Sequence, residues 1–472
     1  FKFRWAMNVV PAVRVAKVHL VPIKAEDQLV DADGNPTDDV ILTVRQKAAP
    51  KIEDNRAGDS LSVIMINQKL GSIATFDSSD NMRNWSGVTL WEATDDLVKK
   101  HPEALGRVRS VKFSMFNLKS GETLPKEVGN LKFLESFSVA SNENNQIREV
   151  NLGDEICSLK YLKNLTVQAY GLTQLPANFI NLGKSLESLN LVSNNFNKLS
   201  DITDIVNEKN FPKLRNLILY AQRRTDVLFD IASLGEKNAS GVYVYNNYPI
   251  GLYGKVNAGT PDRQALLKLL TWDKLNTLEL SYCFLEGELP TDEEMTEALE
   301  AAGKATRYTK SDFSTNKEDY LDKLVGDTCK WLLSGNPVTC KHKDGSVVSA
   351  DVYPLQVPRV LPNCRQLSLN LNFFTGKVPN WILFHPHLVE WNAPTMVFNQ
   401  QPKGKNSDGA AVGFSNMTDD SYSYDYYYGT SDPGSNWEVP GVAYPLYYRT
   451  YVAAGDIDEA ALMAKYRRTK KK

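Results

Sequence analysis

The chain has 472 residues, of which 42% are hydrophobic and 23% charged, and its net charge is −2. This much apolar material predicts folded domains, and the length predicts two or three domains or one long repeat array. The near-neutral balance excludes a general electrostatic attraction to nucleic acid or anionic lipid. No stretch approaches the roughly 20 apolar residues that span a bilayer.

Residues 1–50 are expected to form a small β-module. Alternating apolar and polar residues at 13–21 and 41–46 predict two strands around a polar turn. In that turn, Asp31, Asp33 and Asn35 mimic part of a calcium-binding loop, but Leu42 stands where such a loop needs a bidentate Glu. We therefore expect a solvated hairpin turn and no metal there.

Residues 55–107 are expected to form an N-terminal cap for the array that follows. Segment 59–67 is apolar and could be helix or strand, whereas residues 95–100 predict a helix. Trp85 and Trp91 supply two large aromatic side chains. A repeat array needs such a cap because its terminal coil otherwise exposes an apolar face.

From residue 108 onward, the pattern L-x-x-L-x-L-x-x-N recurs, and its cleanest copy runs from Leu186 to Asn194. The fourth position of successive copies falls at residues 111, 137, 165, 189, 217, 242, 278, 367 and 391. The first five steps are 24–28 residues long, which is the length of a leucine-rich repeat. The copies at 111, 242 and 391 are degenerate.

This periodicity predicts an α/β solenoid over residues 108–400, a right-handed superhelix with a parallel sheet on one face. In each copy the two leucines of L-x-L point inward from a short strand. The Asn position turns the chain, and Leu-Pro segments such as Leu175–Pro176 begin the helical return side. Nine copies with recurring Asn argue against Leu-rich amphipathic helices that imitate the pattern.

The 89-residue step between the copies at 278 and 367 indicates an insertion at about residues 291–360. Segments 284–290 and 374–379 carry Gly and Pro in identical positions, so we expect the two strands before them to be adjacent in the sheet. Residues 291–302 and 319–325 predict helices in the insertion. Cys329 and Cys340 flank a turn-forming run and are either paired or two small buried residues.

After residue 400 the repeat stops. Residues 401–472 are expected to form a Tyr-rich C-terminal cap and tail, with a closing helix at 456–466 followed by basic residues.

Residues 108–400 resemble leucine-rich repeat proteins, with the L-x-G-x-x-P variant at 284–290 and 374–379. Trp85-Ser-Gly-Val resembles the aromatic cap of such arrays in bacterial surface proteins. The strand at 41–46 is similar to the last strand of immunoglobulin-like modules in surface lipoproteins of gut Bacteroidetes. The resemblance implies an exported binding scaffold at the cell surface. Because the chain opens at Phe1 without a signal-peptide pattern, we expect any export or lipidation signal to lie outside it.

The sequence carries no C-x-x-C, G-x-S-x-G or H-E-x-x-H motif, and Gly183-Lys-Ser185 lacks the upstream Gly of a phosphate-binding loop. His385 and His387 are expected to be exposed loop residues, because no third metal ligand stands near them. We therefore expect no catalysis, no cofactor and no metal.

The candidate ligand-binding residues are four tyrosines: Tyr220, Tyr243, Tyr245 and Tyr282. In each copy, the middle residue of L-x-L and the residue after its second Leu are expected to face the concave side. Early copies place small polar residues there, and copies five to seven place aromatic ones. Clustered exposed tyrosines are typical of recognition surfaces, although the same rings could cover the irregular sixth copy or pack on the insertion.

The sequence thus favours a monomeric, non-catalytic scaffold that binds a protein or a glycan. One alternative is an enzyme with its active site in the insertion or C-terminal region and the repeats as a substrate platform. Another is a structural spacer. An enzyme needs convergent titratable groups, of which the sequence shows no set, and a spacer needs no aromatic cluster.

Overall fold

The computed structural model describes residues 13–20, 29–31, 33–37, 40–46, 52–76, 81–141, 149–222, 255–283, 285–306, 355–370, 372–383 and 408–415, with a few shorter pieces between them. Among these residues, no helix has the length and apolar character needed to cross a membrane.

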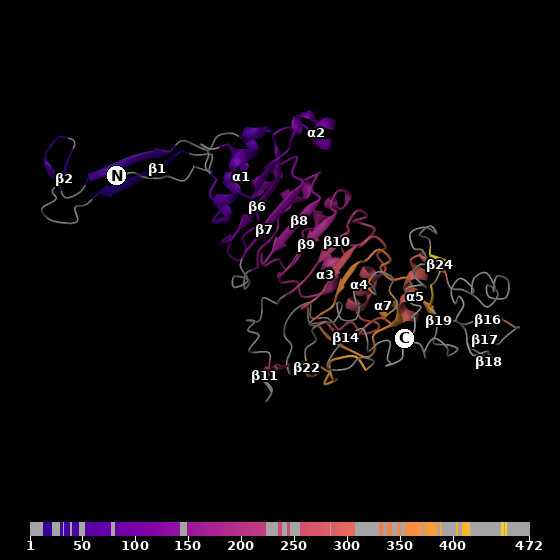
Figure 1. Ribbon diagram of the computed structural model, residues 1–472. Helices are drawn as coiled ribbons and strands as arrows, with labels where there is room; N and C mark the ends of the chain where they lie inside the picture. Colours follow the sequence, from indigo (N-terminus) through magenta and orange to yellow (C-terminus); the bar gives the residue numbers. More distant parts are fainter. Residues whose placement is uncertain are drawn as a thin grey trace, which may run out of the picture.

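The molecule is organised around an eight-stranded sheet in which the strands follow one another in chain order (Figure 1). Seven strands are parallel, and β5 is antiparallel at the N-terminal edge. The strands are β5 (Val88–Leu90), β6 (Val108–Ser114), β7 (Ser136–Ala140), β8 (Asn164–Gln168), β9 (Ser188–Asn190), β10 (Asn216–Ile218), β13 (Thr277–Glu279) and β20 (Gln366–Ser368). This arrangement confirms the predicted parallel sheet, and its strand order fits a solenoid of stacked coils.

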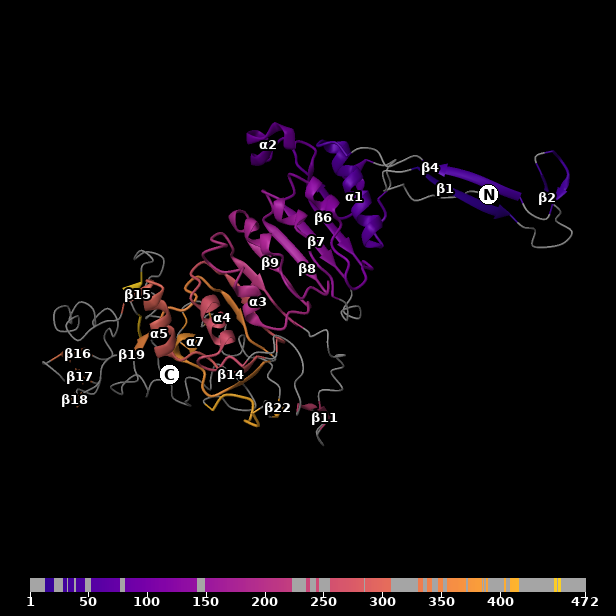
Figure 2. The ribbon, with the colours of Figure 1, turned by 180° about the vertical axis from the view of Figure 1, so that it is seen from behind.

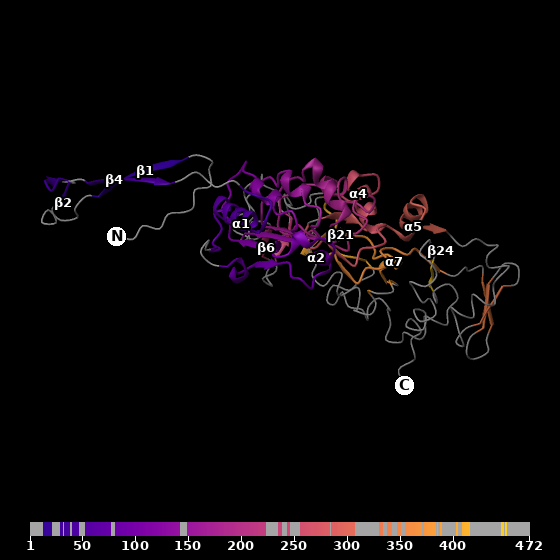
Figure 3. The ribbon, with the colours of Figure 1, turned by 90° about the horizontal axis from the view of Figure 1, so that it is seen from above.

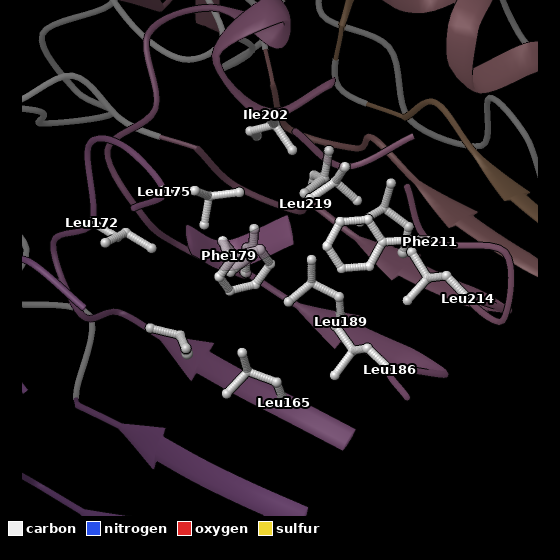
Figure 4. Packing of buried hydrophobic residues seen from close by; sticks show 14 of the residues in the cluster. Leu165, Leu172, Leu175, Phe179, Leu186, Leu189, Ile202, Phe211, Leu214 and Leu219 are labelled. Carbon is white, nitrogen blue, oxygen red and sulfur yellow. The ribbon is translucent and has the colours of Figure 1, made fainter. Parts of the chain in front are cut away.

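The register of the sheet follows the sequence repeat. The fourth-position residues Leu165, Leu189, Leu217, Leu278 and Leu367 pair from strand to strand. As predicted, the inward leucines are fully buried, with no exposed surface at Leu189, Leu191, Leu217, Leu219, Leu278 and Leu280. In Figure 4, Leu189 and Leu219 lie among side chains from the return side, including Phe179, Ile202 and Phe211.

The return side of the coils consists of short helices. Pro125 and Pro176 precede two of them and fix the entry of the chain. The helices are η3 (Lys126–Asn130), η5 (Glu155–Ser158), η6 (Ala177–Lys184), α3 (Leu199–Thr203) and α4 (Pro261–Leu270).

The N-terminal cap begins with α1 (Arg56–Leu70), so the ambiguous apolar segment is a helix. The side chain of Asn55 caps its first turn, and Gly71 ends it in the left-handed region with φ 63°. The expected second helix is present as α2 (Asp96–Lys100). Buried Asp59 on α1 accepts two hydrogen bonds from Arg107, at 2.8 and 2.9 Å, and thereby ties the cap to the first coil.

The N-terminal residues form an antiparallel ribbon of β1 (Arg14–Leu20) and β4 (Val40–Gln46), as predicted. Figure 2 shows it extending away from the α1 end of the solenoid. Between these strands lie β2 (Leu29–Val30) and β3 (Pro36–Thr37). The Asp31 carboxylate accepts hydrogen bonds from the backbone of Asp33 and Asn35, which confirms a hairpin turn closed by its own side chain.

The sixth copy, at 242, is not a coil of the array, and that prediction is wrong. Strand β12 (Tyr243–Tyr245) pairs with β11 (Gly235–Lys237) and β22 (Lys403–Gly404) in a separate sheet. Strand β10 pairs directly with β13 instead. The physical reason is that the L-x-L positions of β10 and β13 match in register, so the 60 residues between Leu217 and Leu278 belong to one coil and not to two.

The large insertion loops out between adjacent strands, as expected. Strand β13 pairs with β20, and the matching segments after them pair as β14 (Glu286–Glu288) and β21 (Phe373–Thr375). The predicted helix is α5 (Asp292–Ala301), capped by Thr291. Figure 3 shows α5 at the opposite end of the solenoid from α1.

Further elements beyond β14 and β21 are α7 (Asn380–Leu383) and short strands. The strands are β15 (Ala305–Thr306), β16 (Lys330–Leu333), β17 (Val338–Lys341), β18 (Val347–Ala350), β19 (Leu355–Val357), β23 (Pro445–Tyr447) and β24 (Arg449–Thr450). The helices expected at 319–325 and 456–466, the closing copy's Trp391, and the question of Cys329 and Cys340 lie outside the described residues.

Five strands of the array, β6, β8, β9, β10 and β13, leave the sheet through a similar turn. The turn residue has φ between 50° and 58° in five coils, although none of the five is glycine: Met115, Ala169, Ser193, Ala221 and Tyr282. In three of these coils the next residue, Asn194, Gln222 or Cys283, has a buried side chain that bonds two coils. Asn194 donates to the carbonyls of Val167 in the preceding coil and Leu191 in its own, at 2.6 and 2.9 Å.

The same bridge recurs along the solenoid. Asn372 donates to Leu280 and Leu369, and Gln222 to Leu191 and Leu219. Cys283 donates its thiol to Leu219 at 3.2 Å. The Asn position therefore bonds backbone groups of the preceding coil as well as of its own.

Replacing Asn194 by Ala should destabilise the protein by about 3 kcal/mol or more. The change leaves the carbonyls of Val167 and Leu191 and the N–H of Leu172 without their buried partner, at about 1–3 kcal/mol each. Urea unfolding measures the loss. The control is Asn190→Ala on the half-buried concave face, whose amide accepts a bond from Val192. Equal losses in the two variants would contradict the bridging role.

Candidate functional site

The concave face carries two columns of side chains set by the strand register. The middle column contains Lys112, Ser138, Thr166, Asn190, Ile218, Glu279 and Ser368. All seven are exposed or half-buried, whereas the L-x-L residues on either side are buried. The second column contains Ser114, Ala140, Gln168, Val192, Tyr220, Ser281 and Asn370. The alternation confirms that the middle column faces away from the core; the second column is half-buried except at Ser281, which is buried.

Tyr220 and Tyr282 come together at the end of strands β10 and β13. Their ring centroids lie 6.1 Å apart with an interplanar angle of 24°, so the rings are stacked. Both residues are half-buried. Tyr282 occupies the left-handed turn position of its coil, at φ 57°, which carries its side chain away from the L-x-L alternation. Two of the four predicted site residues therefore form one aromatic pair.

Tyr243 and Tyr245 do not belong to these columns. They lie in β12, outside the eight-stranded sheet, so their expected place on the concave face of the array is wrong. Their side chains lie outside the described residues. Their role in ligand binding stays a prediction.

Glu279 is a carboxylate on the concave face that sequence reasoning did not select. It stands in the middle column between Ile218 and Ser368, on the strand that leads to Tyr282. In the part of the chain that the structure describes, its carboxylate has no hydrogen bond or ion pair, and burial raises its pKa. In the sequence it is one polar residue of a mixed column, and it lies three residues before Tyr282 on the same coil.

The polar side chains next to Glu279 are already bonded to one another. Ser281 donates to the hydroxyl of Ser368 at 2.9 Å, and the amide of Asn370 donates to that hydroxyl at 3.2 Å. The site therefore offers two aromatic faces and one carboxylate with spare acceptor capacity. A cationic group suits this combination, because it is attracted both by an aromatic face and by a carboxylate.

The described cysteines lie in the core. Cys157, Cys283 and Cys364 are buried, and burial raises the pKa of each thiol to about 12. They are thus thiols and not thiolates at neutral pH, so they are poor nucleophiles.

His385 is buried, and the prediction of an exposed loop histidine is wrong. Its Nε2 lies 3.0 Å from the carbonyl oxygens of both Val360 and Leu361, so the ring fastens two segments of the last coil. His387 lies outside the described residues. Among the residues described, no group of three His, Cys, Asp or Glu side chains is placed to hold a metal ion.

No family model matches this chain, and no curated protein matches it. Among solved structures, a plant ice-binding protein is similar at 15% identity and a TM-score of 0.34, over 75% of this chain and 88% of that one. The plant peptide hormone receptor RGFR1 in complex with RGF2 is similar at 15% identity and a TM-score of 0.28, over 60% and 34%. The complex PEPR1–AtPEP1 is similar at 14% identity and a TM-score of 0.20, over 76% of this chain and 55% of that one. At such TM-scores these likenesses carry no argument about function.

The raised pKa of Glu279 predicts a specific pH dependence of stability. Because the folded state binds this proton more tightly than the unfolded chain, the group stabilises the fold fully below its ordinary pKa of 4.5. That contribution is lost as the pH rises through the raised value. The melting temperature of wild type should therefore fall relative to Glu279→Gln over this window and run parallel to it above.

The control is Glu297→Gln, on the exposed side of α5. Melting curves from about pH 4 to pH 8 for the three proteins test the prediction. Curves of wild type and Glu279→Gln that stay parallel throughout would show that Glu279 is solvated as in the unfolded chain.

Proposed function

We propose that this chain is a leucine-rich repeat protein whose concave face binds a macromolecular partner without catalysis. The observation that carries the proposal is the stacked pair of Tyr220 and Tyr282 where the adjacent strands β10 and β13 end, with the half-buried Glu279 three residues before Tyr282 in the chain. Tyrosines contribute large contact areas at a low cost in side-chain entropy, and a carboxylate with spare acceptor capacity adds directional selectivity. A structural spacer has no use for this combination.

The partner that fits best is a protein segment with a basic side chain. A Lys or Arg head can lie against a tyrosine ring and donate to the Glu279 carboxylate at the same time. A neutral glycan is the alternative, since sugars also stack on aromatic rings and donate hydroxyl hydrogens to carboxylates. The raised pKa of Glu279 favours the first, because a cation restores what burial of the carboxylate costs.

We propose further that the protein is exported and acts at a bacterial cell surface as a monomer. Support comes from the L-x-G-x-x-P copies at 284–290 and 374–379, whose strands β14 and β21 pair in parallel, and from the buried Trp85 of the cap. The absence of catalysis is also a proposal. It is supported by the burial of Cys157, Cys283 and Cys364, whose thiols are kept protonated.

An array of immobilised peptides tests the concave site. Peptides centred on Lys or Arg should be captured more strongly than matched acidic or neutral peptides and than neutral oligosaccharides. Glu279→Gln and Tyr282→Ala should each weaken capture about tenfold or more, since hot-spot truncations cost about 2 kcal/mol. Glu297→Gln is the matched control and should change nothing.

Melting temperatures separate binding from folding. We expect Glu279→Gln to melt at or above the wild-type temperature, because it removes a buried charge. Preferential capture of neutral oligosaccharides would replace the peptide partner by a glycan. Capture that is insensitive to both substitutions would show that the concave pair is not the binding site.

A further inference from the structure

A second surface of the solenoid has the features of a binding site and lies at the opposite end of the strands from the tyrosine pair. It is a groove of about 520 Å³ where strands β6 to β9 begin. We call it the strand-entry groove. Its floor is formed by the residues just before or at the start of successive strands, and its walls include Trp91, Tyr161, Lys160, Lys184 and Lys213. The volume lies in the range of ligand sites.

The floor of the groove is a ladder of alternating charge. Arg109, Glu135, Lys163 and Glu187 stand on successive coils, and the backbone N–H of each later residue donates to the carbonyl of the one before. Arg109 and Lys163 flank Glu135, with N···O distances of 2.7 and 3.2 Å. Within the ladder, these contacts neutralise Glu135.

The remaining acids of the wall are also paired. Asp95 contacts Arg109 at 3.3 Å, and Asp96 contacts Lys99 at 2.8 Å. In contrast, Lys160, Lys184 and Lys213 have no hydrogen bond or ion pair within the residues that the structure describes, and all three are exposed. Glu187 is the one acid of the groove that is similarly unengaged within those residues. The groove thus presents three available cations and one available carboxylate.

The three lysines recur with the coils. Each precedes the first buried leucine of its copy by one or two residues, on the third, fourth and fifth coils. Adjacent strands of a sheet lie about 4.8 Å apart, so successive coils carry these lysines at backbone positions separated by roughly that step, with Lys213 one residue nearer its strand than Lys160 and Lys184. A row of regularly spaced cations suits a ligand that carries one anionic group per repeating unit.

The ring of Tyr161 argues for a sugar rather than a peptide. It lines the groove and is held flat against Phe133, with centroids 5.5 Å apart and an interplanar angle of 16°. A fixed aromatic face packs well against a pyranose ring. An extended acidic peptide repeats its same-face side chains about every 6.6–6.8 Å, which does not match the coil step.

We propose that the strand-entry groove binds an acidic oligosaccharide with one carboxylate or sulfate per sugar ring. Lys160, Lys184 and Lys213 contact the anionic groups, Tyr161 packs against one ring, and Glu187 accepts from sugar hydroxyls. This site is separate from the concave tyrosine pair. In a parallel sheet all strands begin on one side and end on the opposite side, and the two sites lie at these opposite ends of the strands.

Titration calorimetry with the trisaccharide of galacturonic acid tests the proposal. Wild type should bind it at low salt and more weakly at about 0.3 M salt, where charges are screened. The combined change Lys160→Gln, Lys184→Gln and Lys213→Gln should weaken binding about tenfold or more. The control, Lys119→Gln, Lys126→Gln and Lys198→Gln, removes the same charge from exposed positions elsewhere and should change affinity less than about twofold.

Three further arms complete the test. The neutral galactose trisaccharide and hexaglutamate should bind at least tenfold more weakly than the acidic trisaccharide, and Tyr282→Ala should leave its binding unchanged. Each single lysine variant is measured too, with its melting temperature. Equal losses in the control variant, equal or tighter binding of hexaglutamate or the neutral sugar, or no binding of the acidic trisaccharide at low salt would overturn the proposal.

Discussion

The turn at the end of each strand is the constraint on which the rest of the solenoid depends. A left-handed residue reverses the chain, and the buried side chain after it bonds a carbonyl of its own coil and one of the coil before, as Asn194 does. This bridge fixes both the distance and the register between neighbouring coils. Because neighbouring strands are then in register, residues at one repeat position line up across the sheet.

The bridge tolerates different side chains at different costs. A left-handed non-glycine residue costs about 1–2 kcal/mol, and at Ser193 the three buried hydrogen bonds of Asn194 offset that cost. Asn372 forms three such bonds in its own coil. Cys283 has only a weak thiol donor. In the coils nearest the cap, Phe116 and Tyr170 occupy the same position and pack with centroids 5.1 Å apart. Aromatic packing joins the coils there, and the hydroxyl of Tyr170 also donates to the carbonyl of Asn151 at 3.2 Å.

This alignment explains what the sequence could and could not predict. The leucine period predicts the strands and their pairing, including β13 with β20 across the insertion, because the buried L-x-L positions admit one register. It also predicts that the strand at 243–245 belongs to the array, which is wrong, because apolar alternation indicates a strand but not the sheet that the strand joins. Glu279 and the strand-entry groove were missed because their neighbours come from other coils, and in the groove also from the cap through Trp91.

The two proposed sites follow from one geometric property of a parallel sheet: all strands begin on one side of the sheet and end on the opposite side. A charged residue placed before each strand becomes a row at the entry edge, as Arg109, Glu135, Lys163 and Glu187 do. A tyrosine placed after two adjacent strands becomes a compact pair at the exit edge. The entry edge therefore suits an extended ligand with a repeating charge, whereas the exit edge suits a single side chain. The charged residues of the strand-entry groove recur on several coils, whereas the tyrosine pair comes from two coils only. Adding or losing a coil would therefore change the length of the groove and leave the tyrosine pair intact.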